Sequence, residues 1–477
     1  MEKVFEAING VFSFIGPLSD FLWEFPTNFD WYSSIPILGN ISFAIILLLG
    51  SGIFFSFRIG FMQVTYFKKG IRTMTEKRVV ETGISPLASF FLSSAMRVGP
   101  GNILGVTGAI AVGGPGALFW MWISAFFGMA VAYMEGVLAQ IFKEKKDDEF
   151  VGGLPFYGRK LLGNKVWIGV FLSVLYILYA LCCLPAQGFN VVSSVGRMAE
   201  IVTGKTIPSG SAFYYIVGTL IVILTAAIAF GGIKKVSRWT DMMVPVMAVL
   251  YFVITLFIIF TNLGSMPGVF KRIFEEAFGF RQAVAGGFGV VLMNGVKRGL
   301  FSNEAGSGSA PCAAAAAECD SPVKAGFVQA LGVFVDTIVI CSCTAMIMLL
   351  APEDLVQGLS GMELLQTAMH YHMGQFGVIF IAATLFMFSF STFLGILFYA
   401  RGNVAYLFGD NWGSQTGYKV LALVMLFIGG IAAYTFVWDL GDVGIGLMTI
   451  FNIFMLYPLG EKALKELKIY ESEKKKK

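Results

Sequence analysis

The residues Gly99, Pro100, Gly101 and Asn102 have the composition of a helix break inside an apolar segment long enough to span a bilayer. Glycine adopts conformations that interrupt a helix, and Pro100 lacks a backbone donor. A break in lipid persists only where it faces protein, water or a ligand. The helix that restarts near Asn102 directs free N–H groups and a positive dipole end toward the break, which favours binding of a carboxylate. The alternative is a packing kink with small-residue helix contacts.

A second glycine cluster, Gly286, Gly287, Phe288 and Gly289, lies five apolar segments further along the chain and is followed by Asn294-Gly295 and then by Gly306-Ser307-Gly308. The same reasoning predicts a second break there, with Phe288 closing over a small substrate as an apolar lid. The alternative is an ordinary glycine-rich membrane helix, because glycine is frequent in such helices. Two breaks at this spacing predict the two halves of one binding site.

Gln187 and Asn190 follow Pro185 in another apolar segment. Residues three apart share one helix face, so both amides can bond the polar groups of a ligand. The alternative is interhelical hydrogen bonding, worth about 0.6 kcal/mol on average in membrane proteins. The sequence leaves both interpretations open.

Two adjacent hydroxyl residues, Ser391 and Thr392, lie in a further apolar segment after Phe388. Together with backbone carbonyls freed at a nearby helix break, they supply the hard oxygen ligands that suit a small cation such as sodium. The alternative is that each hydroxyl bonds back to the preceding turn of its own helix.

Two ionisable residues, Arg97 and Asp336, fall at predicted membrane depth, where a charge indicates a functional site by default. They are expected to pair with each other. Alternatively, Arg97 takes the place of a second cation, which would fix the stoichiometry at one. Proton coupling through such groups is the second functional hypothesis.

The composition is that of a polytopic membrane protein. Of the 477 residues, 56% are hydrophobic and 13% are charged, and the net charge of +4 gives no reason to expect nucleic-acid binding. A soluble domain has about 25% charged residues. The six cysteines show no metal-binding spacing. The two histidines, His370 and His372, fall in one predicted outer loop away from the candidate serines, so an enzyme is not expected.

Apolar segments of about 20 residues predict eleven membrane spans. Because the two predicted breaks are five spans apart, the second unit enters the membrane in the opposite sense, as in the inverted repeats of secondary transporters. The predicted organisation is an interfacial segment over 1–36, an extra leading helix over 37–58, two five-span repeats over 85–262 and 282–459, and a basic tail over 460–477.

The positive charges predict the orientation. Of the 34 Lys and Arg residues, 27 fall in predicted loops that share one side with the C-terminal tail, Lys297 and Arg298 among them. Cytoplasmic loops carry the excess of Lys and Arg. The N-terminus is therefore expected outside and the C-terminus in the cytoplasm.

Several long motifs resemble the alanine/glycine:cation symporters of prokaryotes, and the resemblance covers nearly the whole chain. They include VGPGNILGV at 98–106, GGPGALFWMW at 113–122, YMEG at 133–136 and NGVKRGLFSNEAGSGSAP at 294–311. The resemblance implies a leucine-transporter-type fold with an extra leading span, located in the prokaryotic cell membrane. It also implies alternating access and sodium-coupled uptake of small neutral amino acids.

By similarity to that fold, the sodium ion would be held by carbonyls near Ala95 and Val98, the carbonyl of Phe388, and the hydroxyls of Ser391 and Thr392. The substrate carboxylate would meet the first break, with the second break and Gln187 around the amino group and side chain.

The chain departs from the family pattern at two positions. Pro100 stands where a small hydroxyl residue is often found, which removes one carboxylate donor. Ile396 stands where an aromatic residue is frequent, which widens the pocket. Glutamine is therefore a candidate substrate beside alanine and glycine. The remaining alternative is a receptor or channel without net transport, and the sequence does not determine the oligomeric state.

Overall fold

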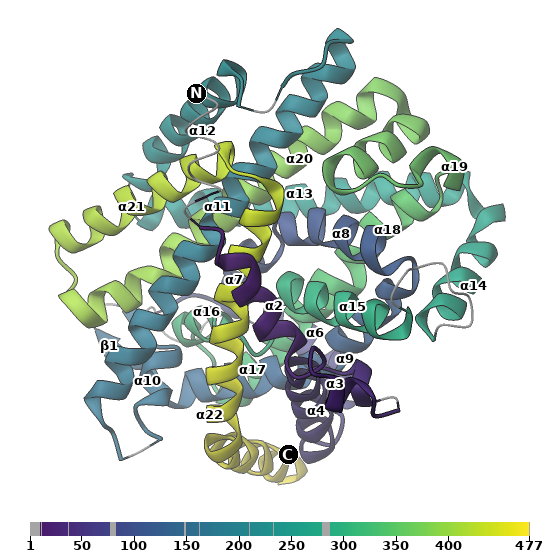
Figure 1. Ribbon diagram of the computed structural model, residues 1–477. Coiled ribbons are helices and arrows are strands. Elements are labelled where there is room, and N and C mark those ends of the chain that lie inside the picture. Colours follow the sequence, from purple (N-terminus) through teal and green to yellow (C-terminus); the bar gives the residue numbers. More distant parts are fainter. Residues whose placement is uncertain are drawn as a thin grey trace.

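A computed structural model describes residues 10, 12–36, 38–76, 83–146, 149–161, 163–208, 210–231, 233–278 and 287–476. Within these ranges the regular secondary structure is helical apart from one short hairpin, and turns and loops connect the elements (Figure 1). Eight helical stretches are long and apolar enough to cross a membrane, and the shorter apolar stretches Phe43–Arg58 and Pro100–Gly113 add to them. The described residues therefore form an all-α polytopic membrane protein.

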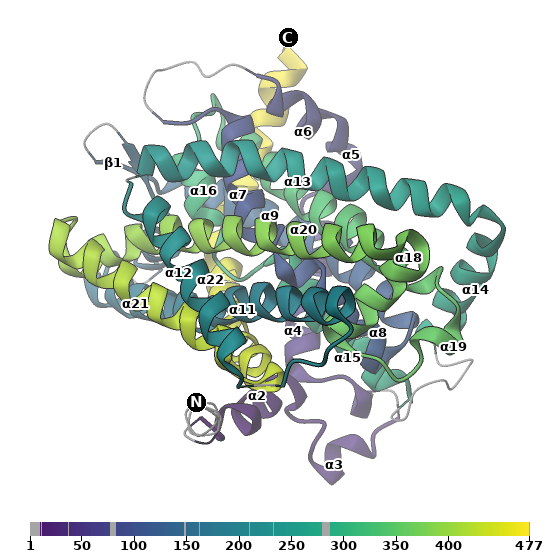
Figure 2. The same ribbon diagram turned by 90° about the horizontal axis from the view of Figure 1, so that it is seen from above.

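Eleven segments correspond to the predicted spans. They are α4 (Phe43–Arg58), α7 (Pro86–Arg97) with η2 (Pro100–Asn102) and α8 (Leu104–Gly113), α9 (Gly116–Ile141), α11 (Val166–Thr203), α12 (Ala212–Ala229), α13 (Ile233–Thr261), α15 (Gly287–Asn303) with α16 (Ala310–Ala316), α17 (Pro322–Val333) with the π-helix η4 (Phe334–Cys341) and α18 (Ser342–Leu349), α20 (Gly361–Phe408), α21 (Trp412–Ile431) and α22 (Tyr434–Lys476). Figure 2 shows α13 and α20 crossing the molecule side by side.

Short elements connect these segments. They are α2 (Ile15–Glu24), α3 (Asp30–Ser33), η1 (Leu38–Asn40), α5 (Met62–Thr65), α6 (Phe67–Met74), the antiparallel strands β1 (Glu144–Lys146) and β2 (Glu149–Val151), α10 (Leu154–Gly158), η3 (Leu263–Ser265), α14 (Met266–Ala277) and α19 (Glu353–Val356). Helix α2 lies against α22 (Figure 1). The indole of Trp23 in α2 donates to the carbonyl of Asp442 in α22 at 3.1 Å.

The predicted first break is confirmed. Ser85 caps α7 by accepting a hydrogen bond from the amide of Ala88, and the helix then ends at Arg97. Gly99 is extended, with φ −134° and ψ −167°, before the 3-10 turn over Pro100–Asn102. Pro100 cannot donate to the carbonyl four residues earlier, so the helix cannot continue through it. The apolar segment is therefore two short helices joined by irregular backbone.

The second predicted break falls partly outside the described residues, which resume at Gly287. Helix α15 begins at Gly287, whose φ is 64°, and continues through Phe288 and Gly289. The chain instead leaves the helix after Asn303, where Gly306 and Gly308 have φ of 91° and 80°. The break at Gly306-Ser307-Gly308 was part of the predicted region, whereas Phe288 and Gly289, also expected to interrupt the segment, lie inside a helix because glycine is only permissive there.

Lys297 and Arg298 also differ from expectation, because they lie within α15 rather than in a cytoplasmic loop. The Lys297 ammonium is 2.7 Å from Asp442, and Arg298 forms two hydrogen bonds with the same carboxylate, at 3.0 and 3.1 Å. Asp442 is fully buried in α22. A charge inside a membrane protein is stabilised by such a partner, so these two residues do not report the orientation of the chain.

Candidate functional site

The two broken segments meet at a small central cavity. It is lined by Met96, Arg97, Gly99, Pro100 and Gly101 of the first break, Cys183 and Gln187 of α11, Phe301 and Glu304 of the second broken segment, Thr392 and Ile396 of α20, and Ile445 of α22. Its volume is about 20 Å³. One water molecule requires about 10 to 15 Å³, so an amino acid enters only after the surrounding helices move apart.

Gly99 lies between Asn102, to which it is hydrogen-bonded, and Thr392. Its amide donates to the side-chain oxygen of Asn102 at 2.9 Å, and its carbonyl accepts from the Asn102 amide at 3.1 Å. A Cβ atom at position 99 would overlap the hydroxyl of Thr392 in α20. Only glycine allows the break to approach α20 this closely. The amide of Gly99 no longer serves the carbonyl of Ala95, as it would in a continuous helix.

The side chain of Asn102 has an internal role. Its amide nitrogen donates to Asp336 Oδ1 at 2.5 Å and to the hydroxyl of Ser302 at 3.1 Å. Ser302 in turn donates to Asp336 Oδ2 at 2.7 Å. These buried contacts connect the first break, α15 and η4, and Asn102 is not among the residues that line the central cavity.

Arg97 and Asp336, expected to pair, have other partners. A guanidinium nitrogen of Arg97 donates to the carbonyl of Gln329 at 3.0 Å. The Asp336 carboxylate is held by neutral donors, Asn102, Ser302 and Thr337. Both side chains are buried, and Arg97 lines the central cavity.

The residues of the predicted cation site lie on α20 and at or just after the end of α7, which is Arg97, and these two helices are in contact, with Gly99 meeting Thr392. The Ser391 hydroxyl donates to the carbonyl of Phe388 at 3.0 Å, which is the intrahelical bond that the alternative interpretation predicts. The Thr392 hydroxyl is buried and has no hydrogen-bond partner among the described residues. A buried hydroxyl without a partner, beside the carbonyl end of a helix, fits a hard cation. Val98 is the residue that follows α7.

The two amides of α11 differ. Gln187 lines the cavity, its amide nitrogen donates to the carbonyl of Cys183 at 3.2 Å, and its side-chain oxygen is buried without a partner in the described part of the chain. Asn190 is fully buried but is not among the lining residues. One helical turn therefore separates a residue that reaches the cavity from one that does not.

Gly287 and Phe288 lie away from the cavity, at the start of α15. The ring of Phe288 packs edge-on against Trp120 at 5.8 Å, in a cluster with Ile45 and Leu292. Phe301, thirteen residues later, is the aromatic side chain that lines the cavity. Sequence reasoning missed Phe301, and it assigned Glu304 to a helix end, a gate or a proton relay rather than to the wall of the cavity.

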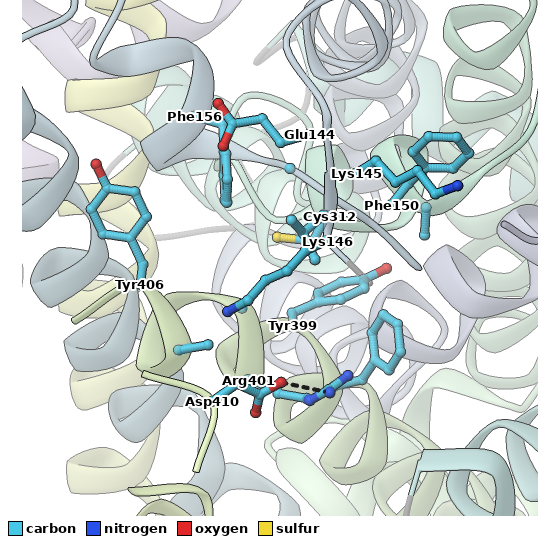
Figure 3. A pocket seen from close by; sticks show the side chains of 16 residues that line it. Glu144, Lys145, Lys146, Phe150, Phe156, Cys312, Tyr399, Arg401, Tyr406 and Asp410 are labelled. Carbon is cyan, nitrogen blue, oxygen red and sulfur yellow. Dashed lines mark hydrogen bonds and ion pairs between the residues drawn. The ribbon is translucent and has the colours of Figure 1, made fainter. Parts of the chain in front are cut away.

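A larger cavity of about 490 Å³ lies further along α20, beside the β1–β2 hairpin (Figure 3). Lys146, Cys312 and the ion pair of Arg401 with Asp410, 2.7 Å long, line it. Tyr399 lines this cavity, whereas Ile396 lines the central one. These residues are three apart, about one helical turn along α20. The Tyr399 hydroxyl donates to the carbonyl of Leu92 in α7 at 3.2 Å.

Comparison with known proteins places the chain in a family. The model of the sodium:alanine symporter family matches residues 31–477. The chain belongs to the sodium:alanine symporter family. Two relatives from Bacillus subtilis (strain 168) are similar along most of their length. The probable sodium/glutamine symporter GlnT is 40% identical over 90% of this chain and 88% of its own, and the amino-acid carrier protein AlsT is 37% identical over 95% and 92%.

The fold of this family member resembles that of a solved transporter. The crystal structure of MhsT in complex with L-phenylalanine superposes with a TM-score of 0.61 at 15% identity, and covers 82% of this chain and 93% of that one. The fold is therefore of the leucine-transporter type, with an extra leading span. The chain is a multi-pass secondary active transporter, and its family and fold are those of transporters rather than enzymes.

Proposed function

We propose that the protein is a sodium-coupled symporter that takes up a small neutral amino acid by alternating access. The observation that carries this proposal is the meeting of two broken helices at one buried cavity, with the hydroxyl of Thr392 against Gly99. Alanine and glycine are the proposed substrates, with glutamine as a third. The name of the matched family supports alanine, and the name of GlnT supports glutamine.

The proposed sodium ligands are the carbonyls of Ala95, Val98 and Phe388 and the hydroxyls of Ser391 and Thr392. The unpartnered Thr392 hydroxyl supports this set. A sodium ion there would draw α7 and α20 together beside the first break. Binding of the cation and closure around the substrate are thereby coupled, because both depend on the same two helices.

The proposed substrate site is the central cavity. The carboxylate would lie at the first break, beside Gly99, Pro100 and Gly101, and the free side-chain oxygen of Gln187 would accept a hydrogen bond from the ammonium group. The side chain would lie against Phe301 and Ile396, two apolar groups that favour a short substrate. Asn190 and Gly287 remain outside this proposal, because the cavity is lined by other residues.

The proposed orientation has the N-terminus outside and the C-terminus in the cytoplasm. The lysines near the end of α22, among them Lys462, Lys465 and Lys468, support it, because positive charge collects on the cytoplasmic side. In this orientation the larger cavity beside Tyr399 opens toward the cytoplasm and is the proposed exit route.

Uptake into proteoliposomes tests the proposal. Labelled alanine, glycine and glutamine are offered with an inward sodium gradient or with the same concentration of potassium. Concentrative uptake that requires sodium is expected for at least one of them. Equal fluxes under both conditions would contradict sodium coupling.

Proton coupling is the second candidate function. The observation that favours it is the Asp336 carboxylate, which is fully buried and bonded to neutral donors. An imposed pH gradient without sodium decides between the two. Uptake driven by that gradient, and its loss in D336N, would establish the proton mechanism instead.

A further inference from the structure

The irregular backbone of the second break has its amides satisfied in an unusual way. The amide of Gly306 donates to Glu135 Oε2 at 3.0 Å, and the amide of Gly308 donates to Glu135 Oε1 at 2.8 Å. Each oxygen of one carboxylate therefore receives one backbone N–H. The intervening amide of Ser307 donates to the carbonyl of Glu304 at 3.0 Å. The break is thus wrapped around a side chain supplied by a different helix, α9.

A second side chain holds the opposite side of the same backbone. The Asn452 amide nitrogen in α22 donates both to Glu135 Oε1, at 2.6 Å, and to the carbonyl of Gly306, at 2.8 Å. The hydroxyl of Tyr157 in α10 donates to the side-chain oxygen of Asn452. Glu135, Asn452 and Tyr157 are all fully buried. Three elements, α9, α10 and α22, therefore fix one turn of irregular backbone.

These contacts have a physical reason. Backbone N–H groups freed by a break have no water to bond at membrane depth, and successive amides in such a turn form a concave site for an anion. A carboxylate is the strongest acceptor that a side chain can offer, because hydrogen bonds to a charged group are about twice as strong as neutral ones. Glu135 supplies that anion from within the protein.

We infer that Glu135 is a positioning residue for substrate binding: it fixes the second break so that Phe301 and Glu304 face the central cavity. The inference rests on the proposed function for the identity of the substrate. The position of Glu135 also determines how the amino acid is oriented between the two breaks. Because the second break already holds an anion, the carboxylate of an amino acid is repelled there and must lie at the first break, with its ammonium group toward the second.

A purely structural role for Glu135 makes a different prediction. If the carboxylate only stabilised the fold, its replacement would lower the amount of folded protein, and the molecules that remained folded would bind substrate normally. A positioning role requires that each folded molecule bind more weakly. The dissociation constant of purified, monodisperse protein separates the two, because it does not depend on the amount recovered.

The experiment compares Glu135→Gln, Glu135→Asp and the control Glu461→Gln, which neutralises an exposed carboxylate on α22. Binding of labelled alanine is measured in sodium. Loss of a charged acceptor for two amides predicts about 10- to 100-fold weaker binding in E135Q. The shorter aspartate keeps the charge but reaches one amide, so E135D is expected to be intermediate. E461Q is expected to bind like the unmodified protein.

A second readout needs no substrate. Cys312 lies in α16, directly after the second break, and lines the larger cavity. In a variant that retains Cys312 alone, we expect E135Q to raise its alkylation rate by N-ethylmaleimide at least fivefold, and E461Q to leave it unchanged. If the unmodified protein takes up no amino acid, the proposed function fails, while this rate still tests the position of the break.

Two results would overturn the inference. One is a dissociation constant for alanine in E135Q within twofold of the unmodified protein, even if less protein is recovered. The other is an unchanged alkylation rate of Cys312 in E135Q. If E135Q does not fold, Tyr157→Phe replaces it, since it removes only the hydroxyl that orients Asn452. Binding about threefold weaker in Y157F then supports the inference, and unchanged binding refutes it.

Discussion

Replacement of Gly99 by alanine tests the contact on which the proposed coupling depends. Gly99 has an extended backbone that any residue adopts, so the added methyl group causes no backbone strain. Its effect is steric, because the Cβ atom would overlap the hydroxyl of Thr392 and lie 3.3 Å from the Thr392 Cβ atom. The Thr392 side chain must therefore rotate away from the proposed sodium ligands.

The expected loss of sodium affinity in G99A follows from the loss of one sodium ligand, the Thr392 hydroxyl. A hydrogen bond or ligand contact to a charged group contributes about 1.5 to 3 kcal/mol, so sodium affinity is expected to fall by about 10- to 100-fold in G99A. T392A removes the same hydroxyl and should cost a similar amount. The double variant should bind sodium no more weakly than T392A alone, because the methyl group then has no hydroxyl to displace.

The assay is alanine uptake as a function of sodium concentration in proteoliposomes, with the half-saturating concentration as the readout. Gly417→Ala is the matched control, because a Cβ atom there meets no atom within 4 Å. Additive losses in G99A and T392A would refute the reasoning, since two independent sites add and two groups in contact do not. Unchanged sodium dependence in both single variants would remove Thr392 from the ligand set.

Three further predictions concern other parts of the molecule. Asp442→Asn leaves Lys297 and Arg298 without their carboxylate, so we expect the free energy of unfolding to fall by about 3 to 5 kcal/mol, measured as a lower thermal midpoint. An unchanged midpoint would show that these ion pairs do not stabilise the fold. Ile396→Ala enlarges the central cavity, so uptake of glutamine relative to alanine should rise about 10-fold in a competition assay, and a fall would exclude Ile396 from the pocket wall. Burial raises the pKa of Cys319 to about 12, so its alkylation rate should increase about tenfold per pH unit from pH 7 to pH 10; a plateau near pH 9 would contradict that burial.

The first break was predictable because its signal is local. Gly99, Pro100 and Gly101 are adjacent, and proline alone prevents the helix from continuing. At this break the chemistry is carried by neighbours in the chain, so no tertiary information is needed to recognise it. The cation site at Ser391 and Thr392 stays a prediction, and Ser391 forms the intrahelical bond of the alternative interpretation.

The second break was located only in part because its signal depends on distant residues. Phe288 and Gly289 lie inside α15, whereas Gly306 and Gly308 leave the helix to reach Glu135, which is 171 and 173 residues away in the chain. The ion pairs of Lys297 and Arg298 were missed for the same reason, since their partner, Asp442, lies on α22. Such pairings are set by tertiary packing, and no local pattern reports them.

In the proposed orientation, Ile396 beside the central cavity and Tyr399 beside the exit cavity lie about one turn of α20 apart. A helical turn is about 5.4 Å long, roughly the length of the amino acid that must pass it. Release inward then needs the parting of a few contacts, such as that of Tyr399 with Leu92, rather than the refolding of a helix. A defect in those few contacts is therefore expected to dissipate the ion gradient before it abolishes binding.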